Sequence, residues 1–297
     1  MDEDPLSYTE IESESLSFSS PDGLTLHVQT WQPLDAPLAH VILLHSLGEY
    51  SGYYHDVATY LYQEDYSCYI PDLRGHGHST GQRGHVEQFQ DYLQDIKILI
   101  TYLQEEVAAA PIFLIGHSIG GVIALMYALA HQQDIAAVVA SSPALQMQMQ
   151  IPGWRILLAN LMARFAPKFT LHNHLNPKLL SHQAHITKTY RNDPLMHNHF
   201  TARWAVEYMK AATWLMDEAR QLAVPVLILQ GGSDKVTDPA ASRTFFDRLG
   251  LEDKYYIEYE TMYHDLLHEV DATSVLGDIE SWLIPRLQPE VGVSLIA

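Results

Sequence analysis

Residues 111–130 read PIFLIGHSIGGVIALMYALA, and the pattern within this stretch decides the fold. An apolar run typical of a buried strand leads into the hexapeptide GHSIGG, and a helix-like apolar stretch follows it. A G-x-S-x-G motif between a strand and a helix predicts a sharp turn that lifts its serine clear of the backbone. Ser118 is therefore a candidate nucleophile. The tightness of such a turn also predicts that side chains at Gly116 and Gly120 would collide with the neighbouring chain.

Short strand-like runs alternate with helical ones elsewhere, which predicts an α/β fold around a mostly parallel central sheet. The first two runs, split by Pro21-Asp22-Gly23, are expected to pair as an antiparallel hairpin. An amphipathic helix is expected over 89–103, where apolar residues recur at a spacing of three and four. The expected strands are 15–19, 24–32, 41–45, 68–70, 112–115, 135–140, 226–230 and 255–259.

The alternation breaks between residues 144 and 216. We therefore predict a core made of residues 1–143 and 217–297, with a helical cap subdomain, 144–216, inserted over the sheet edge that carries Ser118. Within the cap, a stripe of apolar residues runs from Trp154 to Phe165 at helical spacing. Most of that stripe is expected to pack as ordinary core, and the remainder to face lipid or substrate.

Bulk composition excludes several classes of protein. A formal net charge of −19 argues against nucleic acid as a partner, and 47% hydrophobic residues exclude a disordered chain. No apolar run approaches the roughly 20 residues of a membrane span. A single cysteine, Cys68, rules out an internal disulfide. Together with an acidic N-terminal stretch that lacks signal-peptide character, the lone cysteine favours a cytoplasmic location.

Charge is unevenly distributed along the chain. Residues 135–192 contain no Asp or Glu but six Lys and Arg side chains. One interpretation is peripheral contact between the cap and a membrane surface, since a basic amphipathic segment is attracted to anionic lipid. The alternative is that these cations neutralise acidic groups on the underlying core. The sequence leaves the oligomeric state open.

A nucleophilic serine needs an acid and a base, which are expected to follow Ser118 in that order. Two aspartates, Asp234 and Asp238, follow the expected strand 226–230. Asp238 precedes a proline and is better explained as the N-cap of the next helix. Asp234 is therefore the candidate acid.

Two histidines follow the last expected strand. His264 lies in the loop that directly follows this strand, and we take it as the candidate base. His268 lies a turn further along and is expected to be a surface or capping histidine. Two backbone N–H groups, those of Leu47 and Ile119, are the expected oxyanion donors, while His45 is expected to hold the first of these loops by hydrogen bonding.

Seventeen histidines raise the question of a metal site. The sequence has neither an H-E-x-x-H motif nor a cysteine cluster, and a catalytic zinc site needs three protein ligands held together. We therefore expect no metal. The pairs with suggestive spacing are His172/His174, His197/His199 and His264/His268.

Six motifs together resemble the α/β-hydrolases grouped as monoacylglycerol lipases and lysophospholipases, also labelled serine aminopeptidase S33-like hydrolases. The resemblance extends over about 16–285, in the order typical of the family. It implies a capped α/β-hydrolase fold, no cofactor, and a monoacylglycerol or lysophospholipid as the usual substrate. The motifs are HSLGEYSGYY (45–54), PDLRGHGHSTGQRGHV (71–86), GHSIGG (116–121), DPLMHNHFTARWAVEYMKA (193–211), QGGSDKVTDP (230–239) and YHDLLHE (263–269). The roles it implies are nucleophile for Ser118, acid for Asp234, base for His264 and oxyanion donors for Leu47 and Ile119.

The first motif departs from the family pattern His-Gly-x-Gly-Glu-His-Ser-x-Arg-Tyr. Ser46 replaces a glycine, Tyr50 a histidine and Tyr53 the arginine, whereas Glu49 is retained. Glu49 and Tyr53 are the candidate substrate-binding residues. A neutral tyrosine in place of arginine predicts altered recognition of the polar head group. The stretch 74–79, Arg-Gly-His-Gly-His-Ser, is interpreted as a structural loop.

The sequence therefore predicts a serine carboxylester hydrolase that acts on single-chain lipid esters. Three alternatives stay open: a carboxylesterase of broad or short-chain specificity, an S33-type peptidase, and a non-catalytic α/β-hydrolase that only binds a partner.

Overall fold

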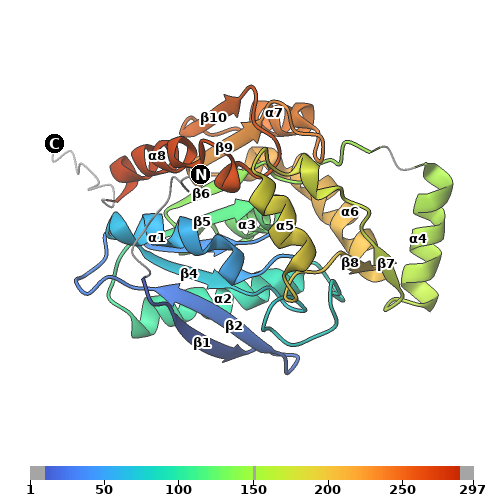
Figure 1. Cartoon of the computed structure of the whole chain (residues 1–297), viewed down its shortest axis with the longest axis horizontal. Coiled ribbons are helices and arrows are strands. Elements are labelled where there is room, and N and C mark those ends of the chain that lie inside the picture. The colour runs from blue at the N-terminus through green and yellow to red at the C-terminus, as the bar shows by residue number, and fades with distance from the viewer. Residues whose placement is uncertain (1–10, 150–151, 288–297) are drawn as a thin grey trace, which may run out of the picture.

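The central feature of the computed structural model, which describes residues 11–149 and 152–287, is an eight-stranded sheet in the order β1-β2-β4-β3-β5-β6-β9-β10 (Figure 1). The strands from β3 onward pair in parallel, while β1 and β2 form the predicted antiparallel hairpin and β2 runs antiparallel to β4. The predicted mostly parallel sheet is thus confirmed. The first and last residues of each expected strand lie within two positions of those observed. The strands are β1 Glu14–Ser19, β2 Thr25–Trp31, β3 His40–Leu44, β4 Ser67–Pro71, β5 Ile112–His117, β6 Ala137–Ser141, β9 Val226–Gly231 and β10 Lys254–Tyr259.

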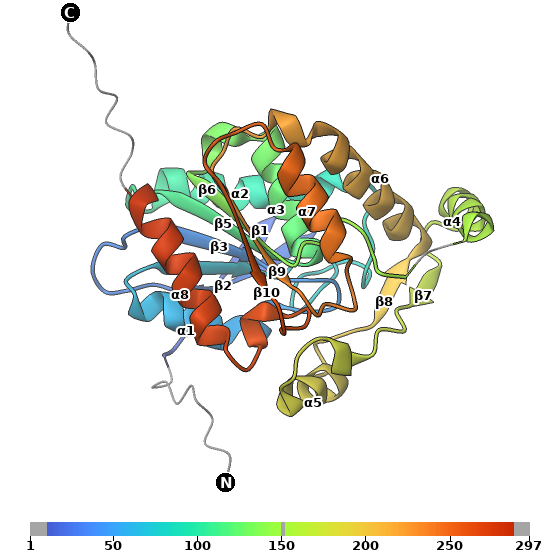
Figure 2. The same cartoon turned by 90° about the horizontal axis from the view of Figure 1, so that it is seen from above.

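Helices cover both faces of this sheet (Figure 2). Successive strand residues point to opposite faces, so Val41 and Leu43 join one core, while Ile42 and Leu44 join the other. This double burial explains why the central strands read as continuous apolar runs. The helices on one face are α1 His55–Gln63 and α8 Ala272–Leu283, and those on the other are α2 Gln90–Glu106, α3 Ile119–Ala130 and α7 Pro239–Arg248.

The insertion, by which we mean residues 144–216, lies between β6 and β9. Its two short strands form a separate antiparallel pair, and its last helix packs on α3. Figures 1 and 2 both place α4 at the end of the molecule, beyond α6. Its elements are α4 Gly153–Phe165, β7 Thr170–His172, α5 Ala184–Asn192, β8 His199–Thr201 and α6 Ala202–Glu218, and α6 continues past residue 216 into the core.

Helix α4 corrects one expectation. Its apolar stripe does not pack as core: Trp154 is 63% exposed and Phe165 77% exposed, and Ala163 is its one buried residue. The reason is that α4 packs mainly against α6 and lies beyond the edge of the sheet (Figure 1), so that no other described element covers its apolar side chains.

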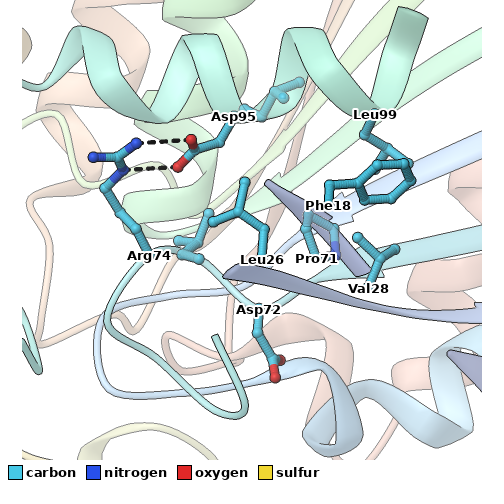
Figure 3. A pocket seen from close by; sticks show the side chains of 10 residues that line it. Phe18, Leu26, Val28, Pro71, Asp72, Arg74, Asp95 and Leu99 are labelled. Atoms are coloured by element: carbon cyan, nitrogen blue, oxygen red, sulfur yellow. Dashed lines mark hydrogen bonds and ion pairs between the residues drawn. The ribbon is translucent and has the colours of Figure 1, made fainter. Parts of the chain in front are cut away.

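The loop 74–79 is held by buried charges. Arg74 forms a bidentate pair with Asp95 of α2, with both N–O distances 2.7 Å, beside a small pocket formed with β1 and β2 (Figure 3). Asp72 accepts hydrogen bonds from the backbone N–H groups of Ser51 and His78 at 2.6 and 2.7 Å. These contacts agree with the interpretation of a structural loop.

Candidate active site

The turn between β5 and α3 is as sharp as its sequence predicts. Ser118 has φ 53° and ψ −113°, a conformation that side-chain-bearing residues rarely adopt and that stores strain. A Cβ atom at Gly116 would lie 2.2 Å from the carbonyl oxygen of Gly120, and one at Gly120 would lie 2.1 Å from that of Leu44. The predicted collisions at both glycines are therefore confirmed. Glycine at 120 lets the start of α3 approach the end of β3.

The structure brings the three predicted side chains together. The Ser118 Oγ lies 2.9 Å from His264 Nε2, and His264 Nδ1 lies 2.8 Å from Asp234 Oδ2. All three are buried. Each comes from a loop at the carboxyl end of a parallel strand, β5, β9 or β10, which is why residues 30 and 146 positions apart meet at one edge of the sheet.

The surroundings of Asp234 fix its charge. Burial alone would raise its pKa, but the imidazole of His264 and donors from Thr237 and Val236 outweigh burial and lower the pKa to about 2. Burial likewise opposes a charge on His264, but the Asp234 carboxylate raises the His264 pKa above its ordinary value. An ionised Asp234 holds a proton on Nδ1, and Nε2 then faces Ser118 as an acceptor.

The residues rejected as acid and base have other contacts. Asp238 accepts from the N–H of Ala240 at 3.0 Å, which confirms the predicted N-cap. His268, expected at the surface, is instead buried, with Nδ1 2.9 Å from Asp265. That expectation was wrong because residues 266–268 form a 3-10 turn that directs the His268 ring onto Tyr53, at a centroid distance of 4.1 Å.

The loop after β3 lies beside this turn. Within the described part of the chain, the N–H groups of Leu47 and Ile119 find no hydrogen-bond acceptor. Ile119 is the first residue of α3, where a free N–H group is available to an anion. His45 bonds the Ser46 carbonyl through Nδ1 at 2.7 Å and accepts from the N–H of Leu73 at 2.9 Å, as expected of a residue that holds the loop.

The two candidate substrate-binding side chains are both buried among protein partners. The Glu49 carboxylate accepts from the hydroxyls of Tyr54 and Tyr190, at 2.7 and 2.8 Å, and from the N–H of Ser46. The Tyr53 hydroxyl donates to Asp265 at 2.7 Å. Contact of either side chain with a substrate stays a prediction.

A group of polar residues beside the three candidate residues was not anticipated from sequence. We call Glu49, His117, Asp265 and His268 the polar cluster; each is less than 9% exposed. In the described residues, His117 has no hydrogen-bond partner at either ring nitrogen, and its ring centroid lies 4.9 Å from that of His264. Members of the cluster come from segments far apart in the chain, so their contacts cannot be predicted from local sequence. The only local signal was the presence of two His and one Asp within residues 264–268.

Three members of this cluster lie close together. One imidazole or carboxylate atom from each of Glu49, His117 and Asp265 lies within 4.8 Å of the other two, the one such group of three among the described residues. Their carboxylate oxygens already accept from hydroxyl, N–H and imidazole donors. Within the described ranges, the histidine pairs singled out by spacing do not form a group of this kind.

The α5 side of the insertion is tied to both loops of the site. Toward the loop after β3, the Tyr50 hydroxyl donates to Asp193 at 2.8 Å, and the N–H of His197 donates to the Gly48 carbonyl at 2.9 Å. Toward the loop of His264, the N–H of Asp265 donates to the Leu180 carbonyl at 2.8 Å. Ser181 and His182 bond the same loop through the His268 carbonyl and Glu269. Helix α4 takes part in none of these contacts.

Comparison with known proteins identifies several relatives. The family described as serine aminopeptidase, S33, matches residues 35–271. A Dictyostelium discoideum protein described as an uncharacterized abhydrolase domain-containing protein is 32% identical over 90% of this chain, which spans only 28% of that relative. A Mycolicibacterium smegmatis monoacylglycerol lipase is 28% identical over 91% of this chain and 97% of its own length.

Solved structures agree. The crystal structure of a Paleococcus ferrophilus monoacylglycerol lipase matches with a TM-score of 0.79 and 31% identity, covering 93% of this chain and 99% of the other. The predicted α/β-hydrolase fold is thereby confirmed. None of the described helices combines the length and apolar character needed to cross a membrane.

Proposed function

Because the chain belongs to the serine aminopeptidase S33 family of α/β-hydrolases, and within it to the lipase and esterase group, we propose that it hydrolyses single-chain lipid esters. Monoacylglycerol and lysophospholipid are the proposed substrates. The observation that carries the proposal is the hydrogen-bonded series Ser118, His264, Asp234 at 2.9 and 2.8 Å.

The proposed reaction follows from this geometry. Ser118 Oγ attacks the ester carbonyl carbon while His264 Nε2 takes the hydroxyl proton. The carbonyl oxygen becomes an oxyanion, and the free N–H groups of Leu47 and Ile119 stabilise it. His264 then gives the proton to the departing alcohol, leaving an acyl group on Ser118. Water, activated by the same imidazole, releases the fatty acid and restores the serine. No cofactor is needed for these steps.

We further propose that the insertion, residues 144–216, caps this site and that α4 contacts the lipid phase. The exposed apolar side chains of α4 are accompanied, near the two ends of the helix, by Arg155 and Arg164, whose guanidinium groups lie over the rings of Trp154 and Phe165. Apolar and cationic groups on one exposed helix favour insertion at an anionic lipid surface. The absence of Asp and Glu from 135–192 removes the acidic groups that would oppose it.

Labelling with a fluorophosphonate probe tests the proposed nucleophile. The wild-type protein should be labelled and Ser118→Ala should not, because the probe reacts with an activated serine hydroxyl. An unlabelled wild type would contradict the proposal and support a non-catalytic binding protein.

A hydrolysis panel then tests the substrate class. It should include monoacylglycerols, lysophospholipids, short-chain alkyl esters and a peptide amide. Preference for long single-chain esters is expected, whereas preference for short esters would indicate a carboxylesterase and cleavage of the amide a peptidase. Activity in Ser118→Ala should fall by at least about 10³-fold.

A further inference from the structure

Directly after the candidate base, the chain places a second pair of acid and imidazole. Asp265 follows His264 in sequence and is fully buried. His268 Nδ1 lies 2.9 and 3.0 Å from the two Asp265 carboxylate oxygens, and its Nε2 lies 3.0 Å from the carbonyl oxygen of Tyr53. Asp265 is an ionised carboxylate, because its pKa lies below the ordinary value, and a carboxylate and a carbonyl can only accept. Both ring nitrogens of His268 therefore carry protons, and the geometry describes an imidazolium.

The other groups that face this pair do not supply a positive charge. The hydroxyls of Tyr53, Tyr54 and Tyr190 are kept neutral, because burial raises the pKa of each well above its ordinary value. Tyr53 stands where the family pattern has arginine, so it brings a donor without a charge. His117 Nε2 is 3.9 Å from Asp265, but burial lowers the His117 pKa to about 4.

His268 is therefore the group in the polar cluster that supplies a positive charge opposite the Asp265 carboxylate. Burial and the proximity of Asp265 raise the pKa of Glu49, so Asp265 ionises in preference to Glu49. Burial opposes a charge on Asp265, but His268 lowers its pKa below the ordinary value, and Asp265 in turn raises the pKa of His268. The Asp265 carboxylate and Asp234 both favour a proton on His264.

We propose that His268 is a positioning residue whose positive charge offsets Asp265 and so leaves the His264 imidazole free to accept the proton of Ser118. Without that charge, an unbalanced carboxylate one residue away would hold His264 in its protonated form, which is not a base. This inference rests on the proposed function, because it assigns a task to the polar cluster in the same reaction.

Opposite shifts in two variants provide the test. In His268→Asn the amide still donates to Asp265 but carries no charge, so the acid limb of kcat/KM on a soluble short-chain ester should move up by about one pH unit. In Asp265→Asn the acid limb should move to lower pH, because the carboxylate that favours a proton on His264 is gone. The double variant should return close to the wild-type limb, since both charges are then gone.

The matched control is His85→Asn, which changes another histidine paired with an acid, Glu87, that contacts neither Ser118, Asp234 nor His264. It should leave the limb in place. Two outcomes would overturn the inference: equal loss of activity in His268→Asn and Asp265→Asn with no shift in the acid limb, or shifts of the limb in the same direction. Either outcome would leave His268 with a merely structural role.

A second measurement separates this inference from the proposed function. In the Ser118→Ala background, the ring of His264 can be titrated by NMR whether or not the protein hydrolyses any ester. The His268→Asn change should raise the His264 titration midpoint there as well. If either charge variant fails to fold, Tyr53→Phe, which removes a neutral donor from Asp265, should raise the midpoint by a smaller amount; no rise would overturn the inference.

Discussion

Asp234 and Asp238 lie four positions apart but differ in their contacts, and substitution should separate them. Asp234→Asn should lower kcat by about 10³- to 10⁴-fold, because an amide favours the wrong imidazole tautomer at His264. Asp238→Asn should be nearly neutral, since asparagine is as good an N-cap as aspartate. Steady-state kinetics on a soluble ester measures both. Similar losses in the two variants would contradict the assignment of separate roles.

The left-handed backbone of Ser118 should be visible in stability. Ser118→Ala and Ser118→Gly both remove the hydroxyl, but only glycine relieves the strain at φ 53°. We expect the glycine variant to be more stable than the alanine variant by up to about 1 kcal/mol. Urea unfolding of the two variants measures the difference. A glycine variant less stable than the alanine variant would show that the backbone conformation at position 118 is not strained.

At the scale of the element, helix α4 offers a test of lipid contact. Leu157→Asn with Phe165→Asn should weaken co-sedimentation with anionic vesicles several-fold, because both side chains are more than 60% exposed and are proposed to insert. Hydrolysis of a soluble short-chain ester should change little. The control is Leu34→Asn with Ile284→Asn, two exposed apolar residues elsewhere, and it should leave vesicle binding intact. Equal effects of both pairs would refute a specific role for α4.

Elements differ in how far the sequence predicts them. The strands and α2 follow from local periodicity, since a strand buried on both faces must be apolar throughout. Helix α4 has the same kind of periodicity, but the pattern cannot say whether another layer covers the apolar face. The strands β7 and β8 went unpredicted because three residues carry no periodic signal.

The candidate site divides in the same way. Ser118, Asp234 and His264 each follow a strand in a recognisable motif, so sequence was enough to select them. Contacts of the polar cluster, such as that between Glu49 and Tyr190, join residues 141 positions apart and depend on how the insertion folds back. The burial of His268 depends on a turn that neighbouring residues alone do not specify.

At the scale of the whole molecule, buried neutral histidines should make stability depend on pH. Burial lowers the pKa of His45, His76 and His197 to about 3 and that of His117 to about 4. The rings of the first three form a column, with centroid distances of 5.2 and 4.6 Å, from the loop after β3 to the insertion. Their neutral state favours the fold most above about pH 6.5, the ordinary value in the unfolded chain.

Between about pH 6 and 5 the unfolded chain carries a proton at each of these histidines, and the folded protein does not. The unfolding free energy should therefore fall by about 1.4 kcal/mol per pH unit for each group. His264 and His268, with raised pKa values, stay protonated in both states there and do not alter the slope. Urea titrations at several pH values measure this slope. His76→Gln should reduce the slope by the contribution of one histidine, about 1.4 kcal/mol per pH unit. A stability independent of pH would contradict this account.

The attachment of the insertion through its α5 side has a consequence for kinetics at interfaces. The backbone bonds from residues flanking α5, His197 to Gly48 and Leu180 to Asp265, hold the two loops beside the hydrogen-bonded Ser118, His264 and Asp234. Because helix α4 makes none of these contacts, a lipid surface that acts on α4 is not expected to be needed to bring Ser118, His264 and Asp234 together. The rate on a short ester should rise smoothly through the concentration at which that ester forms micelles. A lag phase, or an abrupt increase at that concentration, would mean that assembly itself depends on the interface.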